Sequence, residues 1–280
     1  MVKVFDSTAC VLGEGPLWHP NQQCLFWFDI LEKRLFQSTD DGAINWIFDE
    51  NVSAAGWVDE DRLLVASETA LSLFDISTGK REPLVALEED NPGTRSNDGR
   101  ADPFGGFWIG TMGKAAKSAA GAIYRFYKGE VRKLVDNVTV SNAICFSPDG
   151  TKAYFSDTTE QTINTWSLNE KDGWPVGSWK VFIDLREDNL FPDGAVVDAE
   201  GNLWNAQWGA NRVARYSPQG VYMDHILFPA SQTSCPAFGG PDLKTLFVTS
   251  AAIDVQDEMG GQTFTVPTDF KGQKEHRVIL

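Results

Sequence analysis

Four polar side chains recur at nearly the same place in a repeated pattern along the chain. Glu14, Asn97, Asn142 and Asp193 precede apolar segments by 11, 10, 11 and 10 residues. If each repeat folds in the same way, these side chains converge in space. Two carboxylates and two amide oxygens suit hard cations such as Ca²⁺, Mg²⁺ or Mn²⁺. None of the three histidines shares this position, which disfavours a His-rich zinc site.

The apolar segments that follow these side chains define the repeat. Their starts lie 38, 44, 46, 50 and 43 residues apart, at 25–29, 63–67, 107–111, 153–157, 203–207 and 246–250. Gly-, Pro-, Asp- and Asn-rich turns precede each segment, and a third segment with alternating character follows. Repeats of this size with several short strands are typical of propeller blades. We therefore expect an all-β fold, a six-bladed β-propeller that forms a single domain over 1–280, with a metal site in its central channel.

The sequence does not decide which terminal segment closes the ring, and two blades have no polar residue in the shared register. Either terminal segment, 2–11 or 277–280, offers a strand that could complete the last blade. In the shared register the second blade has Ala54 and Ala55, and the sixth has Cys235, for which packing is favoured over function.

Composition excludes several classes of function. The net charge is −15 without a Lys/Arg cluster, which argues against a nucleic-acid partner. No apolar run reaches the roughly 20 residues of a membrane span, and the N-terminus lacks a signal-peptide pattern. The four cysteines show no CxxC pairing. We expect buried, reduced thiols and a cytoplasmic protein, although an even number of cysteines also permits disulfides.

Several other polar residues could be mistaken for catalytic residues but are better explained by structural roles. Asp29 and Asp157 both end second strands, so a structural role in a turn is favoured over catalysis. Ser67, Ser156 and Ser250 lie at similar points, but no Gly-x-Ser-x-Gly motif is present. Trp208 lies where it could reach the mouth of the channel.

Four longer motifs resemble a known family. They are Leu-Gly-Glu-Gly-Pro-Leu-Trp at 12–18, Arg-Ser-Asn-Asp-Gly at 95–99, Ser-Asn-Ala-Ile-Cys-Phe-Ser-Pro-Asp-Gly at 141–150 and Phe-Pro-Asp-Gly-Ala-Val-Val-Asp at 191–198. Together they are similar to the senescence marker protein/gluconolactonase family, which includes regucalcin. The resemblance extends from about residue 12 to residue 266. It implies a six-bladed propeller that holds one divalent metal ion and hydrolyses sugar lactones.

The resemblance also implies roles for particular residues. The metal ligands fall on Glu14, Asn142 and Asp193, and substrate contacts fall on Arg95 and Asn97, with Asp98 beside them. Asp193 is the candidate general base, with a hydroxide on the metal as the competing nucleophile. Some family members have a Glu in the loop at 113–121, where this chain has none. The identity of the metal stays open among Ca²⁺, Mg²⁺, Mn²⁺ and Zn²⁺.

The expected reaction is hydrolysis of an aldonolactone, such as gluconolactone or a pentonolactone, to the sugar acid. Lactones of aldaric acids remain an alternative, because Arg95, Lys114 and Lys117 could meet a second carboxylate. Two other functions remain open: a non-enzymatic Ca²⁺-binding propeller, and an esterase or phosphotriesterase. The last of these predicts an apolar rim around the channel.

Overall fold

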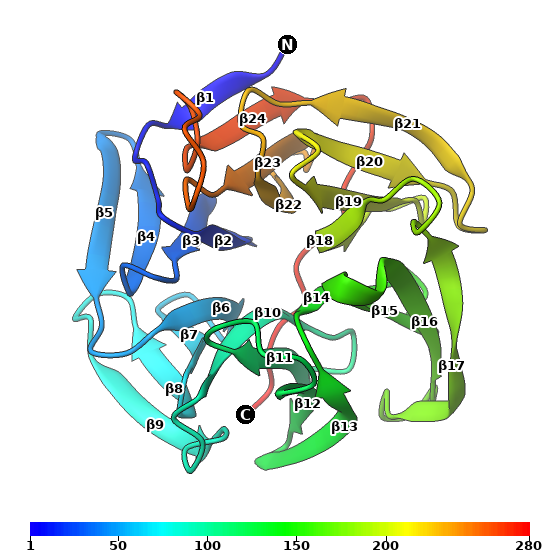
Figure 1. Cartoon of the computed structure of the whole chain (residues 1–280). Helices are drawn as coiled ribbons and strands as arrows, with labels where there is room; N and C mark the ends of the chain where they lie inside the picture. The colour runs from blue at the N-terminus through cyan, green and yellow to red at the C-terminus, as the bar shows by residue number, and fades with distance from the viewer.

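Six antiparallel sheets form a ring around a central channel in the computed structural model, which describes residues 1–280 (Figure 1). Each sheet has four strands, ordered from the channel outward. The innermost strands are β2 (Gly13–His19), β6 (Val52–Trp57), β10 (Thr94–Ala101), β14 (Ser141–Phe146), β18 (Phe191–Val197) and β22 (Thr233–Gly239). The predicted six-bladed propeller is confirmed.

The second strands coincide with the six apolar segments of the repeat. They are β3 (Cys24–Asp29), β7 (Arg62–Ser67), β11 (Phe107–Gly113), β15 (Lys152–Asp157), β19 (Leu203–Trp208) and β23 (Thr245–Ser250). Neighbouring blades cover both faces of these strands, and in β3 all six residues are buried. This burial explains why the segments are apolar throughout rather than alternating.

The outer half of each blade contains one strand more than the repeat predicted. The third strands are β4 (Arg34–Thr39), β8 (Ala70–Asp75), β12 (Gly121–Tyr127), β16 (Thr162–Leu168), β20 (Arg212–Tyr216) and β24 (Thr263–Pro267). The fourth strands are β5 (Gly42–Ile47), β9 (Arg81–Ala86), β13 (Glu130–Val138), β17 (Pro175–Asp184), β21 (Tyr222–Leu227) and β1 (Lys3–Asp6). The fourth strands are largely exposed, for example β9 and β21. Their weak apolar signal explains why the repeat did not reveal them.

The N-terminal segment closes the ring. β1 pairs with β24 in an antiparallel register in which Lys3 lies opposite Thr265, and Figure 1 shows the two strands side by side. The first and last blades are thereby joined through one sheet, which removes an open edge between them.

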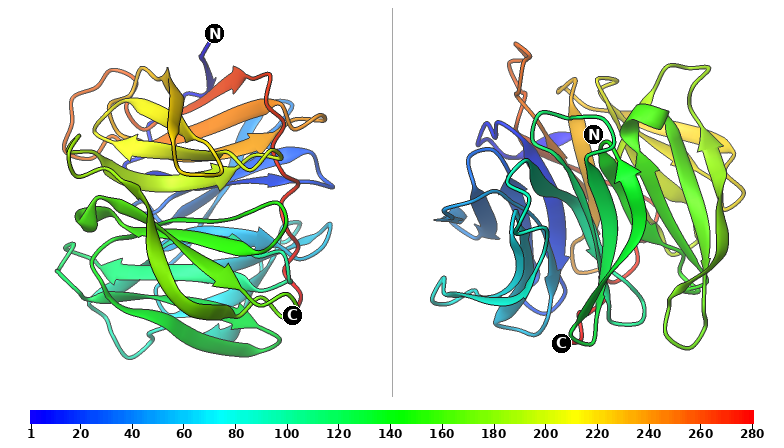
Figure 2. Two further views of the ribbon diagram at one scale, coloured as in Figure 1. Left: turned by 90° about the vertical axis from the view of Figure 1, so that its right-hand side faces the viewer. Right: turned by 60° about the horizontal axis from the view of Figure 1, so that its bottom comes forward.

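The C-terminal segment has a different role. It runs across one flat face of the ring (Figure 2). Gln273 Nε2 donates to the carbonyl oxygens of Phe146 and Val197 at 3.0 and 2.9 Å. These carbonyls lie at the ends of β14 and β18, whereas the residues of the repeated register lie near the beginnings of the inner strands. The C-terminal segment and the candidate site therefore occupy opposite ends of the channel.

The helical content and the state of the cysteines test two expectations from the sequence, the absence of a membrane span and the reduced thiols. The helical element is a 3₁₀ turn, η1 (Thr158–Glu160), and no helix is long and apolar enough to cross a membrane. All four cysteines are free and buried. The cytoplasmic location stays a prediction.

Candidate functional site

An irregularity in each inner strand positions the residues of the repeated register. The regular pairing with the second strand is interrupted after Glu14 in β2 and after Asn142 in β14. The following residues, Gly15 and Ala143, have φ angles of 56° and 57°. Such bulges re-aim a side chain that would otherwise face a neighbouring blade. Local backbone geometry thus turns these side chains toward the channel.

One cavity collects five of the six predicted site residues. Its volume is about 440 Å³, and Glu14, Arg95, Asn97, Asn142 and Asp193 all line it. Each of these residues is no more than 6% exposed. The polar side chains therefore form the floor of a cavity large enough for a small organic molecule.

A chain of hydrogen bonds crosses this floor from blade to blade. Arg95 Nη1 donates to Asn97 Oδ1 at 2.7 Å, and Asn97 Nδ2 donates to Asn142 Oδ1 at 3.0 Å. Asn142 Nδ2 in turn donates to Thr158 Oγ1 at 2.8 Å. These bonds fix the orientation of both amides and leave one lone pair of Asn142 Oδ1 available.

The two carboxylates at the floor are close enough to influence each other. Burial, and then the charge of Asp98, raises the pKa of Glu14. Burial, and then the charge of Glu14, raises the pKa of Asp193 well above its usual range. Burial lowers the pKa of Arg95 to about 10, opposed by Glu14 and Asp193. Concentrating buried negative charge in this way favours a bound cation.

Asp98 lies beneath the floor and does not line the cavity. Its Oδ2 accepts a hydrogen bond from the Ile144 backbone amide at 2.7 Å, and the residue is 4% exposed. Burial raises the pKa of Asp98 to about 6, while the Ile144 amide and Arg100 oppose this shift. The contact of Asp98 with substrate stays a prediction, and its position outside the cavity lining favours a supporting role.

Sequence reasoning missed most of the cavity's upper walls. Leu31, Lys114, Thr158 and Ile253 line the cavity and lie just after second strands, and Trp208 ends one. The second strand is antiparallel to the first, so its end lies beside the site residue of the same blade. The positions one to three residues after the apolar segments were thus a signal in the sequence that would have identified these walls in five of the six blades.

The residues set aside from catalysis have structural roles. Asp29 accepts hydrogen bonds from the Val11 and Leu12 amides at 2.8 and 3.1 Å. Asp157 accepts from the Thr139 and Val140 amides at 2.7 and 3.1 Å. Both aspartates hold the segment that enters their own blade. Cys235 is 1% exposed and lies outside the cavity lining.

Residues 12–252 match the model of the SMP-30/gluconolactonase/LRE-like region. The chain belongs to this family. The L-arabinolactonase of Azospirillum brasilense is 36% identical over 90% of this chain and 85% of its own. The pentonolactonase of Haloferax volcanii is 32% identical over 93% of this chain and 88% of its own.

A solved structure of the family shares the whole architecture. It is a calcium-binding protein, regucalcin, from Agrobacterium tumefaciens, with 39% identity and a TM-score of 0.98. The match covers 100% of this chain and 98% of that one. The family resemblance noted from the sequence is therefore confirmed across the full propeller.

The donor set suits a divalent cation. No three His, Cys, Asp or Glu side chains gather in a way that could hold a metal, so the candidate set includes an amide. Its members are the carboxylates of Glu14 and Asp193 and the oxygen Oδ1 of Asn142, all lining one cavity. Oxygen donors of this kind match Ca²⁺, Mg²⁺ or Mn²⁺ better than softer metals.

Proposed function

We propose that this protein is a metal-dependent sugar lactonase that hydrolyses an aldonolactone of five or six carbons to the sugar acid. The observation that carries the proposal is the meeting of two buried carboxylates, Glu14 and Asp193, with Arg95 and Asn97 at one cavity floor. The names of the arabinolactonase and pentonolactonase relatives support the substrate class.

Glu14, Asn142 and Asp193 are the proposed metal ligands. When bound there, a divalent cation supplies positive charge that polarises the lactone carbonyl and stabilises the negative charge developing on its oxygen. Thr158 and Asn97 hold the amide of Asn142, and its Oδ1 keeps one lone pair for a ligand. This arrangement fixes a ligand before any cation arrives.

Asp193 is the proposed general base. Its carboxylate takes a proton from the water that attacks the carbonyl carbon, and the ring oxygen leaves from that carbon as a hydroxyl that takes up this proton. Burial beside Glu14 raises the pKa of Asp193, which makes the carboxylate a stronger base than an exposed aspartate. Coordination of a cation would lower the pKa of Asp193 again and so remove part of this added basicity.

Arg95 and Asn97 are the proposed substrate contacts. The hydrogen bonds of Arg95 to protein use only Nη1, which leaves Nε and Nη2 for substrate oxygens. Asn97 is held by Arg95 on one side and by Asn142 and the Ser141 carbonyl on the other. Rigid donors of this kind orient a lactone ring at low entropic cost.

The decisive experiment measures acid release from a panel of aldonolactones before chelation, after chelation, and after adding back single divalent metals. Asp193→Ala is measured in parallel. We expect turnover that a metal restores in the native protein and not in the variant. Cation binding by calorimetry without turnover above the spontaneous rate would instead establish a non-enzymatic cation-binding propeller.

A second candidate is an esterase, because the walls above the polar floor are apolar. Eight of the sixteen residues that line the cavity are hydrophobic. This differs from the polar site expected from the sequence and fits an ester with an apolar acyl group. An aryl butyrate added to the panel tests it: preference for the ester over every aldonolactone would favour the esterase.

A further inference from the structure

Four large apolar side chains from three blades line the cavity. They are Leu12, Leu31, Trp208 and Ile253, here called the apolar wall. Trp208 and Ile253 both pack against the hydrophobic cluster that contains Leu12. The Ile253 amide also donates to the Val11 carbonyl at 3.1 Å. The wall is therefore a fixed surface with contributions from three blades.

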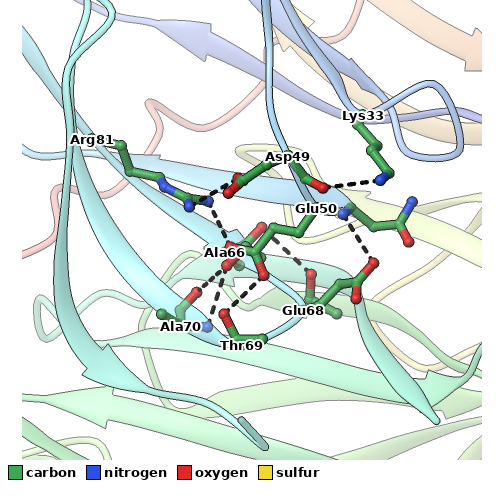
Figure 3. A network of polar contacts seen from close by, with 11 residues as sticks. Lys33, Asp49, Glu50, Ala66, Glu68, Thr69, Ala70 and Arg81 are labelled. Carbon is green, nitrogen blue, oxygen red and sulfur yellow. Dashed lines mark hydrogen bonds and ion pairs between the residues drawn. The ribbon is translucent and has the colours of Figure 1, made fainter. Parts of the chain in front are cut away.

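The groups that could recognise a charged substituent are already occupied or lie elsewhere. Lys114 Nζ donates to Glu68 Oε2 at 2.6 Å. The other oxygen of Glu68, Oε1, accepts the Asn51 amide at 3.0 Å. Figure 3 shows Glu68 within the polar network at this edge of its blade, near Glu50 and Thr69. Lys114 is thus neutralised by an anchored carboxylate.

Two further observations oppose an anionic substituent. Lys117 does not line the cavity, whereas Asp254 does, and it adds a carboxylate beside Ile253. Arg95 lies at the floor among Glu14 and Asp193, whose charges act on it. Of the cationic side chains that line the cavity, Lys114 is therefore paired with Glu68, and Arg95 lies at the floor rather than on the apolar wall.

We infer that the distal carbon of a δ-lactone substrate, the ring carbon bound to the ring oxygen, lies against the apolar wall and carries a methyl group or hydrogen, not a carboxylate. This inference rests on the proposed lactonase function and names the substrates of the same site: pentonolactones and terminally deoxygenated hexonolactones. A methyl group gains apolar contact there. A hydroxymethyl group loses hydrogen bonds to water, and a carboxylate without a partner is penalised far more strongly. The structure thus argues against the aldaric lactones that the sequence left open.

The test compares three δ-lactones of one absolute configuration that differ only in the group on the distal carbon. They derive from galactonic acid (hydroxymethyl), fuconic acid (methyl) and galactaric acid (carboxylate). We expect kcat/KM for the methyl compound to exceed that of the hydroxymethyl compound by about tenfold, with the carboxylate compound lower still. Equal or reversed preference among lactones that are all hydrolysed would overturn this inference alone. Absence of hydrolysis for every lactone of the wider panel would overturn the proposed function as well.

Two variants locate the preference in the structure. Ile253→Asn places a polar amide on the apolar wall and should lower the methyl-to-hydroxymethyl ratio several-fold. Ile47→Asn, on the outer strand β5, is the matched control, because Ile47 is 74% exposed and far from the cavity lining. The ratio of the kcat/KM values for two substrates does not depend on the fraction of correctly folded enzyme. An unchanged ratio in Ile253→Asn would contradict the placement of the distal carbon.

A third variant tests the neutralisation of Lys114. Glu68→Gln keeps an acceptor for the Asn51 amide and removes the charge that pairs with Lys114. We expect turnover of the carboxylate compound to rise relative to the methyl compound. A relative rate that stays unchanged would show that the Lys114–Glu68 pair does not decide specificity.

Discussion

At the scale of single residues, the floor of the cavity combines groups that would repel one another in isolation. Glu14 and Asp193 share the cavity floor, and Asp98 lies buried beneath them. Arg95 supplies one compensating charge from within the same floor. The site therefore carries an excess of buried negative charge, which a divalent cation would balance.

The first prediction concerns Asp193→Asn, which keeps the shape of the side chain and removes its charge. We expect kcat/KM on the best aldonolactone to fall by at least about a hundredfold, because the base is lost. In the absence of metal, the free energy of unfolding should stay the same or rise, since one buried like charge is removed. Activity within about threefold of the native value would contradict the role of Asp193. Urea unfolding in a chelator provides the stability measurement.

The second prediction concerns how the stabilisation of the protein by a bound cation depends on pH. An acid whose pKa is raised by folding stabilises the native state when protonated, and this contribution is lost as pH rises through the raised value. Glu14 and Asp193 both have raised pKa values in the metal-free protein. The metal-free protein should therefore lose this contribution toward pH 8, where a cation replaces the protons.

The measurement compares Tm with saturating Ca²⁺ and with a chelator at about pH 6 and about pH 8. At a hundred times Kd, the cation should stabilise the protein by about 2.7 kcal/mol. At a fixed Ca²⁺ concentration, we expect the difference between the two Tm values to be larger at the higher pH. A Tm difference that does not grow with pH would show that the two carboxylates are not linked to cation binding. The double variant Glu14→Gln/Asp193→Asn is the control and should show no such growth.

At the scale of elements, backbone conformation decides where the side chains point. Gly15 follows Glu14 in the irregular part of β2 and has a φ of 56°. A Cβ atom there would lie 2.2 Å from the Ser53 carbonyl oxygen. The glycine thus permits a close approach between the first two blades beside the site. Asn142 achieves a similar orientation through Ala143, which adopts a φ of 57° despite its Cβ atom.

The third prediction concerns Gly15→Ala. We expect the free energy of unfolding to fall by more than about 2 kcal/mol, because left-handed strain adds to a clash with backbone. Gly129→Ala is the matched control: its φ is 78°, and no atom lies within 4 Å of the added Cβ. The control should lose only about 1 kcal/mol from conformational strain. Equal losses in urea unfolding would show that the approach to Ser53 is not restrictive.

At the scale of the whole molecule, the C-terminal segment ties blades together at the end of the channel opposite the cavity. Arg100 and Glu275 form a buried ion pair there, with side chains 10% and 7% exposed. The Trp57 indole donates to the Glu275 carbonyl at 2.9 Å, and the Val278 amide donates to the Trp57 carbonyl at 2.9 Å. The segment therefore joins strands that are distant in sequence.

The fourth prediction concerns Glu275→Ala. Removing this carboxylate leaves the Arg100 guanidinium buried without its ion-pair partner, so we expect the free energy of unfolding to fall by about 3 kcal/mol. Glu130→Ala breaks the pair between Glu130 and Arg132, whose side chains are 54% and 53% exposed. That control should change stability little. Similar values for both variants in chemical denaturation would show that the C-terminal pair contributes no more than a surface one.

The sequence alone was enough to predict the propeller and most of the cavity floor. The period of the apolar segments predicted six blades, because second strands buried on both faces must be apolar. The shared register of Glu14, Asn97, Asn142 and Asp193 placed these residues together, because a ring aims equivalent positions at one axis. Family motifs added Arg95, which also lines the cavity.

Only the tertiary structure decided what surrounds that floor. Lys114 is paired with Glu68, which lies 46 residues away, and Asp98 faces Ile144 rather than the cavity. The apolar wall brings Leu12 together with Ile253 through ring closure by β1. A repeat in the sequence shows which positions are buried, or face the channel, in every blade. Contacts between loops of different blades follow instead from the closed ring, which no local pattern encodes.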